Sequence, residues 1–369
     1  PSIEKATRKA FPDGIDAFGT DALRFTFASL ATQSADLRFD LARVGGYRNF
    51  CNKLWNASRF VLMMLEDTAA TAANASPATT TSVADRWIVS RLGQTLDTVD
   101  QAFAEYRFDF AASALYEFTW YEFCDWYLEL TKPILQGEGV SEEAKQATRQ
   151  TLHRVLEALL RALHPLMPFI TEEIWQRVRV ASGAEEDAAA TIMTARWPKA
   201  SDWPRDTAAE VDVEWIKTFV LGIRQIRGEM DISPSRKLGV LIENASADDR
   251  RRLDSQSSYL ARLAGLESLR ELVAGEVAPP SALAVIGDMR AMVPMEGLID
   301  PQAEVARLEK RAAKTRDEIQ KARNKLANEN FVRNAPPEVV TQEQGRVADF
   351  ERTLASIDSQ LQRVRALLK

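Results

Sequence analysis

Hydrophobic residues recur every three or four positions through most of the first 233 residues, which is the periodicity of amphipathic helices. An Ala-, Thr- and Ser-rich stretch at 67–82 interrupts the pattern and is expected to form a loop. Long helices joined by short connections pack as a bundle. The expected helices span residues 22–30, 42–64, 84–106, 109–135, 141–164, 168–181 and 211–233.

Two helix starts in this region carry polar residues suited to capping. Gly19-Thr20-Asp21 stands directly before the first expected helix, where short polar side chains can satisfy free backbone N–H groups. Pro168 opens the helix at 168–181, and Thr171 with Glu173 supplies polar groups near its start. Four apolar residues of that helix are expected in the core, namely Phe169, Ile170, Ile174 and Trp175.

After residue 233 the helical period gives way to short runs typical of strands. Gly287-Asp288 lies between the last two runs and is expected to form a hairpin turn. A helix at 248–264 separates the first two runs, so the pattern predicts a small α+β unit. The expected strands span residues 238–242, 269–273, 283–286 and 291–294.

Two sustained heptad repeats follow each other between Pro301 and Lys369. The segment at 328–337, rich in Asn and Pro, breaks the helix between them. Because the runs match in length and the break is short, they predict an antiparallel two-helix coiled-coil arm, and pairing between two chains stays open as an alternative. The repeat positions are Val305, Leu308, Ala312, Thr315, Ile319, Ala322 and Leu326, then Val347, Phe350, Leu354, Ile357, Leu361, Val364 and Leu368.

Length and composition agree with a mainly α fold of several parts. A chain of 369 residues exceeds one ordinary domain, and 46% hydrophobic residues are enough for packed cores. Ile3, Ala6 and Ala10 already follow helical spacing without an initiator Met, which indicates a piece of a longer protein. The expected parts are a tail at 1–40, a helical bundle at 41–205, the α+β connecting unit at 206–299 and the arm at 300–369.

Charge is unevenly distributed along the chain. The net charge is −6, yet residues 301–369 hold 14 Lys/Arg and 10 Asp/Glu, a net of +4, so the rest carries −10. A basic arm on an acidic body favours a polyanionic partner for the arm.

No catalytic motif stands out in the sequence. It has no Gly-rich phosphate loop and no Gly-x-Ser-x-Gly. Cys51 and Cys124 are too few for a disulfide framework and lack metal-ligand spacing, and His153 and His164 are expected to be structural. We therefore expect no catalytic residue, metal or cofactor in this chain and a reducing, cytoplasmic setting. No apolar run approaches the roughly 20 residues of a membrane span.

The helix at 42–64 has two chemically distinct faces. Phe50, Leu54, Ala57 and Val61 share the face expected to be buried. Amide, guanidinium and aromatic side chains lie elsewhere on the helix, and such groups read base edges and stack on unpaired bases. Burial of this face against a neighbouring helix is the alternative. The candidate base-contacting residues are Arg48, Asn49, Asn52, Lys53, Trp55, Asn56 and Arg59.

The first helix of the arm carries a basic stripe at heptad positions that are expected to face away from the partner helix. Such a stripe suits phosphate contacts, which are sensitive to salt and blind to sequence. Glu309 and Glu318 interrupt it, so a solvated coiled-coil face is the alternative. The candidate phosphate-contacting residues are Arg307, Lys310, Arg311, Lys314, Lys321 and Lys325.

Several segments resemble the C-terminal part of class I aminoacyl-tRNA synthetases for branched aliphatic amino acids. They are Gly19–Phe25, Tyr47–Phe60, Glu122–Tyr127, His164–Phe169 and Thr171–Glu173. Within that group, further segments resemble bacterial valyl-tRNA synthetases. These are Met292–Ile299, Lys325–Asn328, Phe331-Val332 and Ala335–Val340.

The resemblance implies a role in tRNA binding. The bundle would be the anticodon-binding domain for a valine tRNA, the arm would lie against the outer corner of that tRNA, and residues 1–40 would lie next to the acceptor stem. The family's two ATP-binding signature motifs and its editing domain match no stretch here. The chain would thus be a non-catalytic, monomeric part of an enzyme that uses ATP and Mg²⁺.

Two other interpretations remain open. The chain could be a scaffold whose coiled coil dimerises or recruits a protein. It could also be the same region of an isoleucyl-type synthetase, although those enzymes typically end in a cysteine-bound zinc that two distant cysteines cannot supply.

Overall fold

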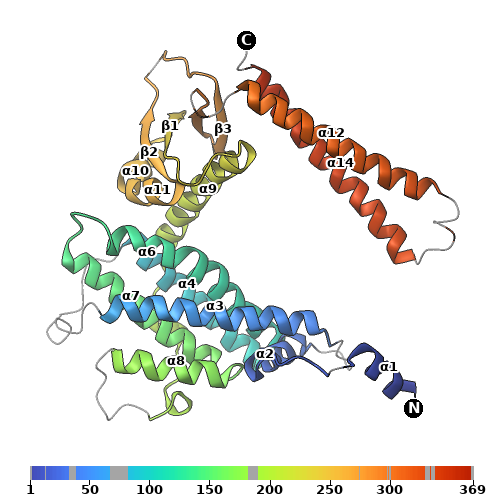
Figure 1. Cartoon of the computed structure of the whole chain (residues 1–369). Coiled ribbons are helices and arrows are strands. Elements are labelled where there is room, and N and C mark those ends of the chain that lie inside the picture. The colour runs from blue at the N-terminus through green and yellow to red at the C-terminus, as the bar shows by residue number, and fades with distance from the viewer. Residues whose placement is uncertain are drawn as a thin grey trace. The chain divides into compact units, whose positions relative to one another are not determined.

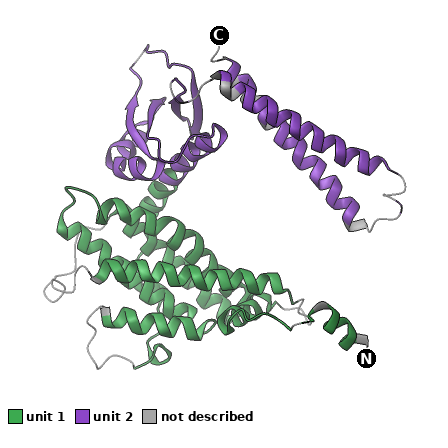
Figure 2. Ribbon diagram, in the orientation of Figure 1, with its two compact units in different colours: residues 1–215 green, residues 216–369 purple. Residues whose placement is uncertain are grey.

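The computed structural model of the chain describes residues 2–12, 14–32, 39–66, 82–181, 190–273, 275–296, 298, 301–328, 333 and 337–366. Residues 67–81 of the expected loop at 67–82, most of the break at 328–337 and the repeat position Leu368 lie outside these residues. The chain forms two compact units, Pro1–Trp215 and Ile216–Lys369, which are described separately (Figure 2).

The first unit is a bundle of helices, as the periodicity predicts (Figure 1). Helix α3 packs against α2, α7 and α8, while α4 packs against α5 and α7. The helices are α1 Ser2–Ala10, α2 Thr20–Leu30, α3 Leu41–Glu66, α4 Val83–Ala104, α5 Phe108–Glu117, the π-helix Phe118–Tyr127, α6 Leu128–Leu135, α7 Glu142–Leu163 and α8 Pro168–Ala181. Two 3₁₀ turns follow at Ile192–Thr194 and Ala200–Asp202.

The expected single helix at 109–135 is three consecutive segments with a π-helix in the middle. In that segment backbone hydrogen bonds run from residue i to i+5, a pattern usually confined to a single turn. Hydrophobic spacing alone does not separate this geometry from an α-helix, so the sequence expectation was wrong in this respect.

A buried carboxylate joins three elements of the bundle. Asp85 accepts hydrogen bonds from Tyr127 Oη at 2.7 Å and from Thr148 Oγ1 at 2.8 Å, and it completes a capping box with Ser82 at the start of α4. Burial raises the pKa of Asp85, and these hydrogen bonds oppose the rise. One side chain thus connects α4, the π-helix and α7.

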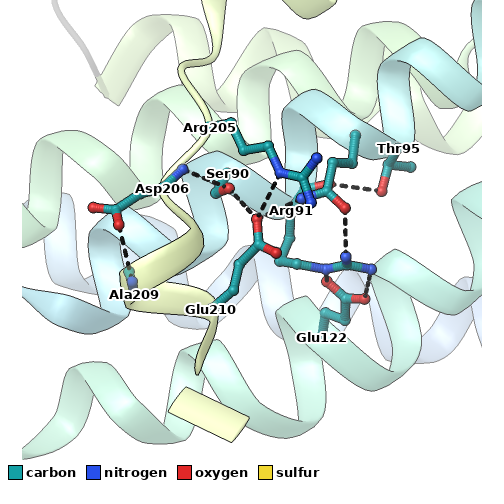
Figure 3. A network of polar contacts seen from close by, with 9 residues as sticks. Ser90, Arg91, Thr95, Glu122, Arg205, Asp206, Ala209 and Glu210 are labelled. Carbon is teal, nitrogen blue, oxygen red and sulfur yellow. Dashed lines mark hydrogen bonds and ion pairs between the residues drawn. The ribbon is translucent and has the colours of Figure 1, made fainter. Parts of the chain in front are cut away.

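A second polar network anchors the start of helix α9, Thr207–Glu229, on α4 (Figure 3). Ser90 Oγ accepts from the backbone N–H of Asp206 at 2.9 Å and donates to Glu210 Oε1 at 2.5 Å. Next to it, Arg91 makes a two-pronged ion pair with Glu122 at 2.7 and 2.8 Å. Helix α9 begins in the first unit and ends in the second.

The second unit contains the predicted four-stranded sheet, in the order β2-β1-β4-β3. Strands β1 and β2 are parallel and the other pairs antiparallel. The hairpin turn is confirmed, since Ile286 pairs with Met289 and Gly287 has a φ of 60°. The elements are β1 Leu238–Glu243, α10 Ala247–Ser255, α11 Ser257–Ala264, β2 Leu266–Glu271, β3 Ser281–Ile286 and β4 Met289–Pro294.

Two boundaries in this unit differ from expectation. Gln256 divides the helix expected at 248–264 into α10 and α11. Strand β2 begins at Leu266, because Gly265 adopts a left-handed conformation that ends α11 and turns the chain directly into the strand. Helix α9 covers the sheet so closely that a Cβ on Gly222 would lie 2.9 Å from that of Ala284.

The arm is an antiparallel pair of helices, α12 Pro301–Ala327 and α14 Pro337–Ala366 (Figure 1). Ion pairs between Arg365 and Glu309 at 2.6 Å and between Arg316 and Asp358 at 3.2 Å fix the antiparallel direction. The side chains buried between the helices occupy predicted heptad positions, namely Leu308, Ala312, Ile357, Leu361 and Val364.

Candidate nucleic-acid interface

Helix α3 buries the face that the sequence predicts and leaves a polar stripe exposed. Phe50, Leu54 and Val61 are fully buried and Ala57 nearly so. Arg48, Asn52, Asn56 and Arg59, which we call the α3 stripe, recur at helical spacing and are exposed. Within the described parts of the chain, none of these four side chains has a hydrogen-bond or ion-pair partner. Their donors and acceptors are free to bind another molecule.

Trp55 lies beside this stripe but is half-buried. The guanidinium carbon of Arg177 on α8 sits 4.8 Å from the centre of a Trp55 ring, and Arg177 is held by an ion pair with Glu173 at 2.6 Å. Such a cation–π contact stabilises the packing of α8 on α3. Trp55 therefore contributes to structure, in line with the alternative interpretation of this face.

The last two candidate residues on α3, Lys53 and Asn49, differ in whether their side chains are already engaged within the bundle. Lys53 Nζ forms an ion pair with Asp125 at 2.5 Å and lies 3.9 Å from the centre of a Trp120 ring, both in the π-helix. Its charge is thus engaged on the side of α3 that meets the π-helix. Asn49 is exposed. The helical spacing of residues in the sequence could not show that Lys53 is engaged, because its partners Trp120 and Asp125 lie 67 and 72 residues further along the chain.

A cavity of about 330 Å³ opens at one end of the α3 stripe. Arg48 and Asn52 line it together with the start of α2 and the first residues of α8. Phe169 also lines it and is 64% exposed, so its expected place in the core was wrong, whereas Ile174 and Trp175 are buried as expected. An exposed ring beside free amide and guanidinium groups suits stacking of an unpaired base. The position of Phe169, immediately after a proline at the first helical turn, was the available sequence signal.

The caps at this end of the bundle differ from expectation. Gly19 precedes α2 without any side-chain cap, and Asp21 instead accepts hydrogen bonds from the backbone N–H groups of Phe169 and Ile170. Thr171 does not cap α8 either, because its hydroxyl donates to Met167 O at 2.7 Å. Asp21 is thus used across the bundle, where it holds the α8 end of the cavity against α2.

The thiols near this region are poor nucleophiles. Burial, with a further contribution from the nearby Asp21 carboxylate, raises the pKa of Cys51 to about 11. Burial raises the pKa of Cys124 to about 12. At neutral pH both remain protonated, and only a thiolate attacks or ligates efficiently.

On the arm, the structure divides the candidate phosphate contacts into two groups. Lys310, Arg311 and Lys314 are exposed, and none of them has an ion-pair partner among the residues that the structure describes. The other three are engaged. Arg307 pairs with Asp231 at 3.5 Å, Lys321 with Glu318 at 2.9 Å and Lys325 with Glu343 at 2.7 Å.

The pairing of Lys325 contradicts the expectation that it faces away from the partner helix. Its heptad position flanks the apolar seam, so the long side chain reaches across to Glu343 on α14. Hydrogen bonding to Lys325, together with the Arg346 charge, lowers the pKa of Glu343.

The described residues show neither a metal centre nor a membrane span. No group of three or more His, Cys, Asp or Glu side chains among them could hold a metal ion. No helix in the described ranges offers the long apolar stretch that crossing a bilayer requires.

Two family models match this chain, one in the bundle and the start of the sheet and one in the arm. The family model "Anticodon-binding domain of tRNA ligase" matches residues 85–242, and "Valyl tRNA synthetase tRNA binding arm" matches residues 300–365. Over 365 residues, the chain is 46% identical to the valine--tRNA ligase of Acinetobacter baylyi. The chain belongs to the valyl-tRNA synthetase family. The match covers 99% of this chain and 37% of the relative, so the chain spans about a third of that valyl-tRNA synthetase.

The range matched by the anticodon-binding model does not include the α3 stripe. The anticodon-binding model begins at residue 85, so the α3 stripe precedes its matched range although α3 packs in the same bundle. Among solved structures, the chain was also compared with the crystal structure of the ternary complex of LeuRS, tRNA and LeuAMS from Agrobacterium radiobacter K84. The two chains are 19% identical in sequence, with a TM-score of 0.36, and the match covers 50% of this chain and 20% of that chain. A likeness of that size supports no inference about this chain.

Proposed function

We propose that this chain is the portion of a valine–tRNA ligase that holds valine tRNA, with the bundle at the anticodon and the arm at the outer corner of the tRNA. The observation that carries the proposal is the 46% identity to a valine--tRNA ligase across nearly the whole chain, together with the match of the arm to the valyl-tRNA synthetase tRNA-binding arm.

The α3 stripe is the part of the bundle best suited to bases. Arg48 and Asn52 present free donors and acceptors beside the exposed ring of Phe169 at the same cavity. Asn56 and Arg59 continue this chemistry along the helix. Unpaired anticodon bases are recognised through their edges and by stacking, and each stacked base contributes roughly 1–3 kcal/mol.

In this proposal the chemistry of the ligase belongs to the rest of the protein. Attachment of valine at the expense of ATP, with Mg²⁺, would take place in a catalytic domain that this chain does not match. The residues described here position the tRNA. The protein would work as a monomer in the cytoplasm, where two half-buried free thiols are stable.

The test is a binding comparison with two tRNAs. The chain is titrated into labelled transcripts of valine tRNA and isoleucine tRNA, and fluorescence anisotropy reports the dissociation constants. We expect tighter binding of valine tRNA, since anticodon recognition adds to phosphate contacts that both tRNAs share. Equal affinities would contradict valine specificity, and the absence of binding to either would contradict the tRNA-binding function.

A further inference from the structure

The charge of the arm is divided along its length, and the ion pairs between α12 and α14 show which segments lie together. Arg365 contacts Glu309 and Asp358 contacts Arg316 near the base of the arm, while Glu351 contacts Arg323 towards the tip. Because Arg316 lies opposite Asp358, we divide the arm there, into residues 301–316 with 358–366 and residues 317–328 with 337–357. We call these pairs the base and the tip half of the arm.

The two halves differ in net charge. The base half holds seven Lys/Arg and three Asp/Glu, a net charge of +4. The tip half holds five Lys/Arg and six Asp/Glu, a net charge of −1. The positive charge that the whole arm carries is thus concentrated in the base half. A polyanion approaching the arm is attracted to the base and not to the tip.

Side-chain pairing sharpens the same division. In the tip half, Lys321, Arg323 and Arg352 pair with Glu318, Glu351 and Asp349, and Lys325 and Arg346 share Glu343. A cation that already contacts a carboxylate must give up that contact before it can bind a phosphate. In the base half, Lys310, Arg311 and Lys314 are exposed and without such a partner among the described residues.

Lys310, Arg311 and Lys314 also share one face of α12. Positions three and four apart on a helix are neighbours, so Lys310 and Arg311 each lie next to Lys314. Arg307 precedes them by one turn on the same face, where Asp231 holds its guanidinium. On the far side of this cluster, Asp317 and Glu318 follow at the start of the tip half, which bounds the basic face.

We propose that the cluster Lys310, Arg311 and Lys314 at the base of the arm is the phosphate-binding site for the tRNA backbone, and that the tip half makes no net electrostatic contribution to binding. This inference rests on the proposed tRNA-binding function. It restricts the phosphate contacts to the base half of the arm, whereas the basic stripe predicted from the sequence runs the length of α12 and would place contacts in both halves.

The experiment compares two triple variants of the whole chain with equal loss of charge. The base variant carries Lys310→Gln, Arg311→Gln and Lys314→Gln. The tip control carries Lys321→Gln, Arg323→Gln and Arg352→Gln, three exposed cations in ion pairs that contribute little to stability. Circular dichroism verifies that both remain helical. The affinity for a valine tRNA transcript is then measured across a series of KCl concentrations.

The base variant should reduce the slope of log affinity against log salt by about 2 to 3, because each lost phosphate contact removes about 0.9. Its affinity at low salt should fall by about tenfold or more, while the tip control should stay within about threefold of the unchanged chain. Equal losses in the two variants, or an unaltered slope in the base variant, would overturn the site. If the unchanged chain fails to bind tRNA, the proposed function itself fails.

Discussion

The carboxylate of Asp21 accepts a 2.6 Å hydrogen bond from the backbone N–H of Ile170, which lies 149 residues further along the chain. Asp21 is almost fully buried, and its other oxygen accepts from the N–H of Phe169. The free N–H groups at the start of α8 are thus satisfied by a side chain of α2. This contact fixes the wall of the cavity that Arg48 and Asn52 share.

Replacing Asp21 by Ala should lower the free energy of unfolding by about 1–2 kcal/mol, the usual cost of losing a helix cap. Urea unfolding followed by circular dichroism measures the change. Asp16→Ala provides the control, since Asp16 is exposed in the segment before α2 and should change stability by less than about 0.5 kcal/mol. Equal effects of the two replacements would show that the cap does not stabilise the bundle.

Gly265→Ala should destabilise the second unit by about 1–3 kcal/mol. Gly265 has a φ of 67°, and an added Cβ would lie 2.9 Å from a guanidinium nitrogen of Arg227. That guanidinium is nearly buried and donates to the carbonyls of Ala264 and Gly265 at the end of α11. Thermal unfolding followed by circular dichroism reports the loss.

Gly228→Ala is the matched control for this replacement. Gly228 lies within α9, and nothing stands within 4 Å of the position of its added Cβ. Alanine favours a helix over glycine by about 0.5–1 kcal/mol, so this variant should gain stability. A Gly265→Ala variant as stable as Gly228→Ala would contradict the role assigned to the left-handed turn.

Cys51 and Cys124 should react slowly with a thiol reagent at pH 8 in the folded protein. Their pKa values of about 11 and about 12 lie above the ordinary value of 9.0, so the thiolate fraction falls by about 100-fold and about 1000-fold. Mass spectrometry of iodoacetamide-treated protein measures the rates, with urea-unfolded protein as the reference. Labelling of the folded protein at the unfolded rate would contradict the burial of these thiols.

The chain should sediment as a monomer. The apolar seam of the arm is filled within one chain, because Leu308 and Ala312 of α12 pack with Ile357 and Leu361 of α14. A second copy therefore finds no free heptad face in the described part of the arm. Sedimentation velocity at several protein concentrations tests this, and a tight dimer that ignores tRNA would favour the scaffold interpretation.

Local periodicity predicted most of the fold. The bundle helices, the buried face of α3 through Phe50 and Leu54, and the arm seam through Leu308 and Ile357 all follow from spacing, because each side chain's environment is set by its own helix. The Gly287-Asp288 turn follows from local backbone preference.

The features that the sequence could not predict depend on partners distant in the chain. Asp21 was expected to cap its own helix and caps α8, and Lys325 was expected to face solvent and pairs with Glu343. Phe169 was expected in the core and is exposed. In each case the residue type and its position on its helix are known from the sequence, but the neighbour that decides its role comes with the tertiary packing.

The central claim, that the α3 stripe reads the valine anticodon, is tested most directly by anticodon discrimination. The dissociation constants of the whole chain for a valine tRNA transcript and for an anticodon-altered copy are measured by fluorescence anisotropy. They are compared among the unchanged chain, an Arg48→Ala, Arg59→Ala variant, and an Arg196→Ala, Lys199→Ala control that loses two exposed cations outside the stripe. We predict that the unchanged chain and the control prefer the valine anticodon by about tenfold or more, and that the stripe variant binds both tRNAs equally. Equal binding of the two tRNAs by the unchanged chain, or full discrimination by the stripe variant, would contradict the claim.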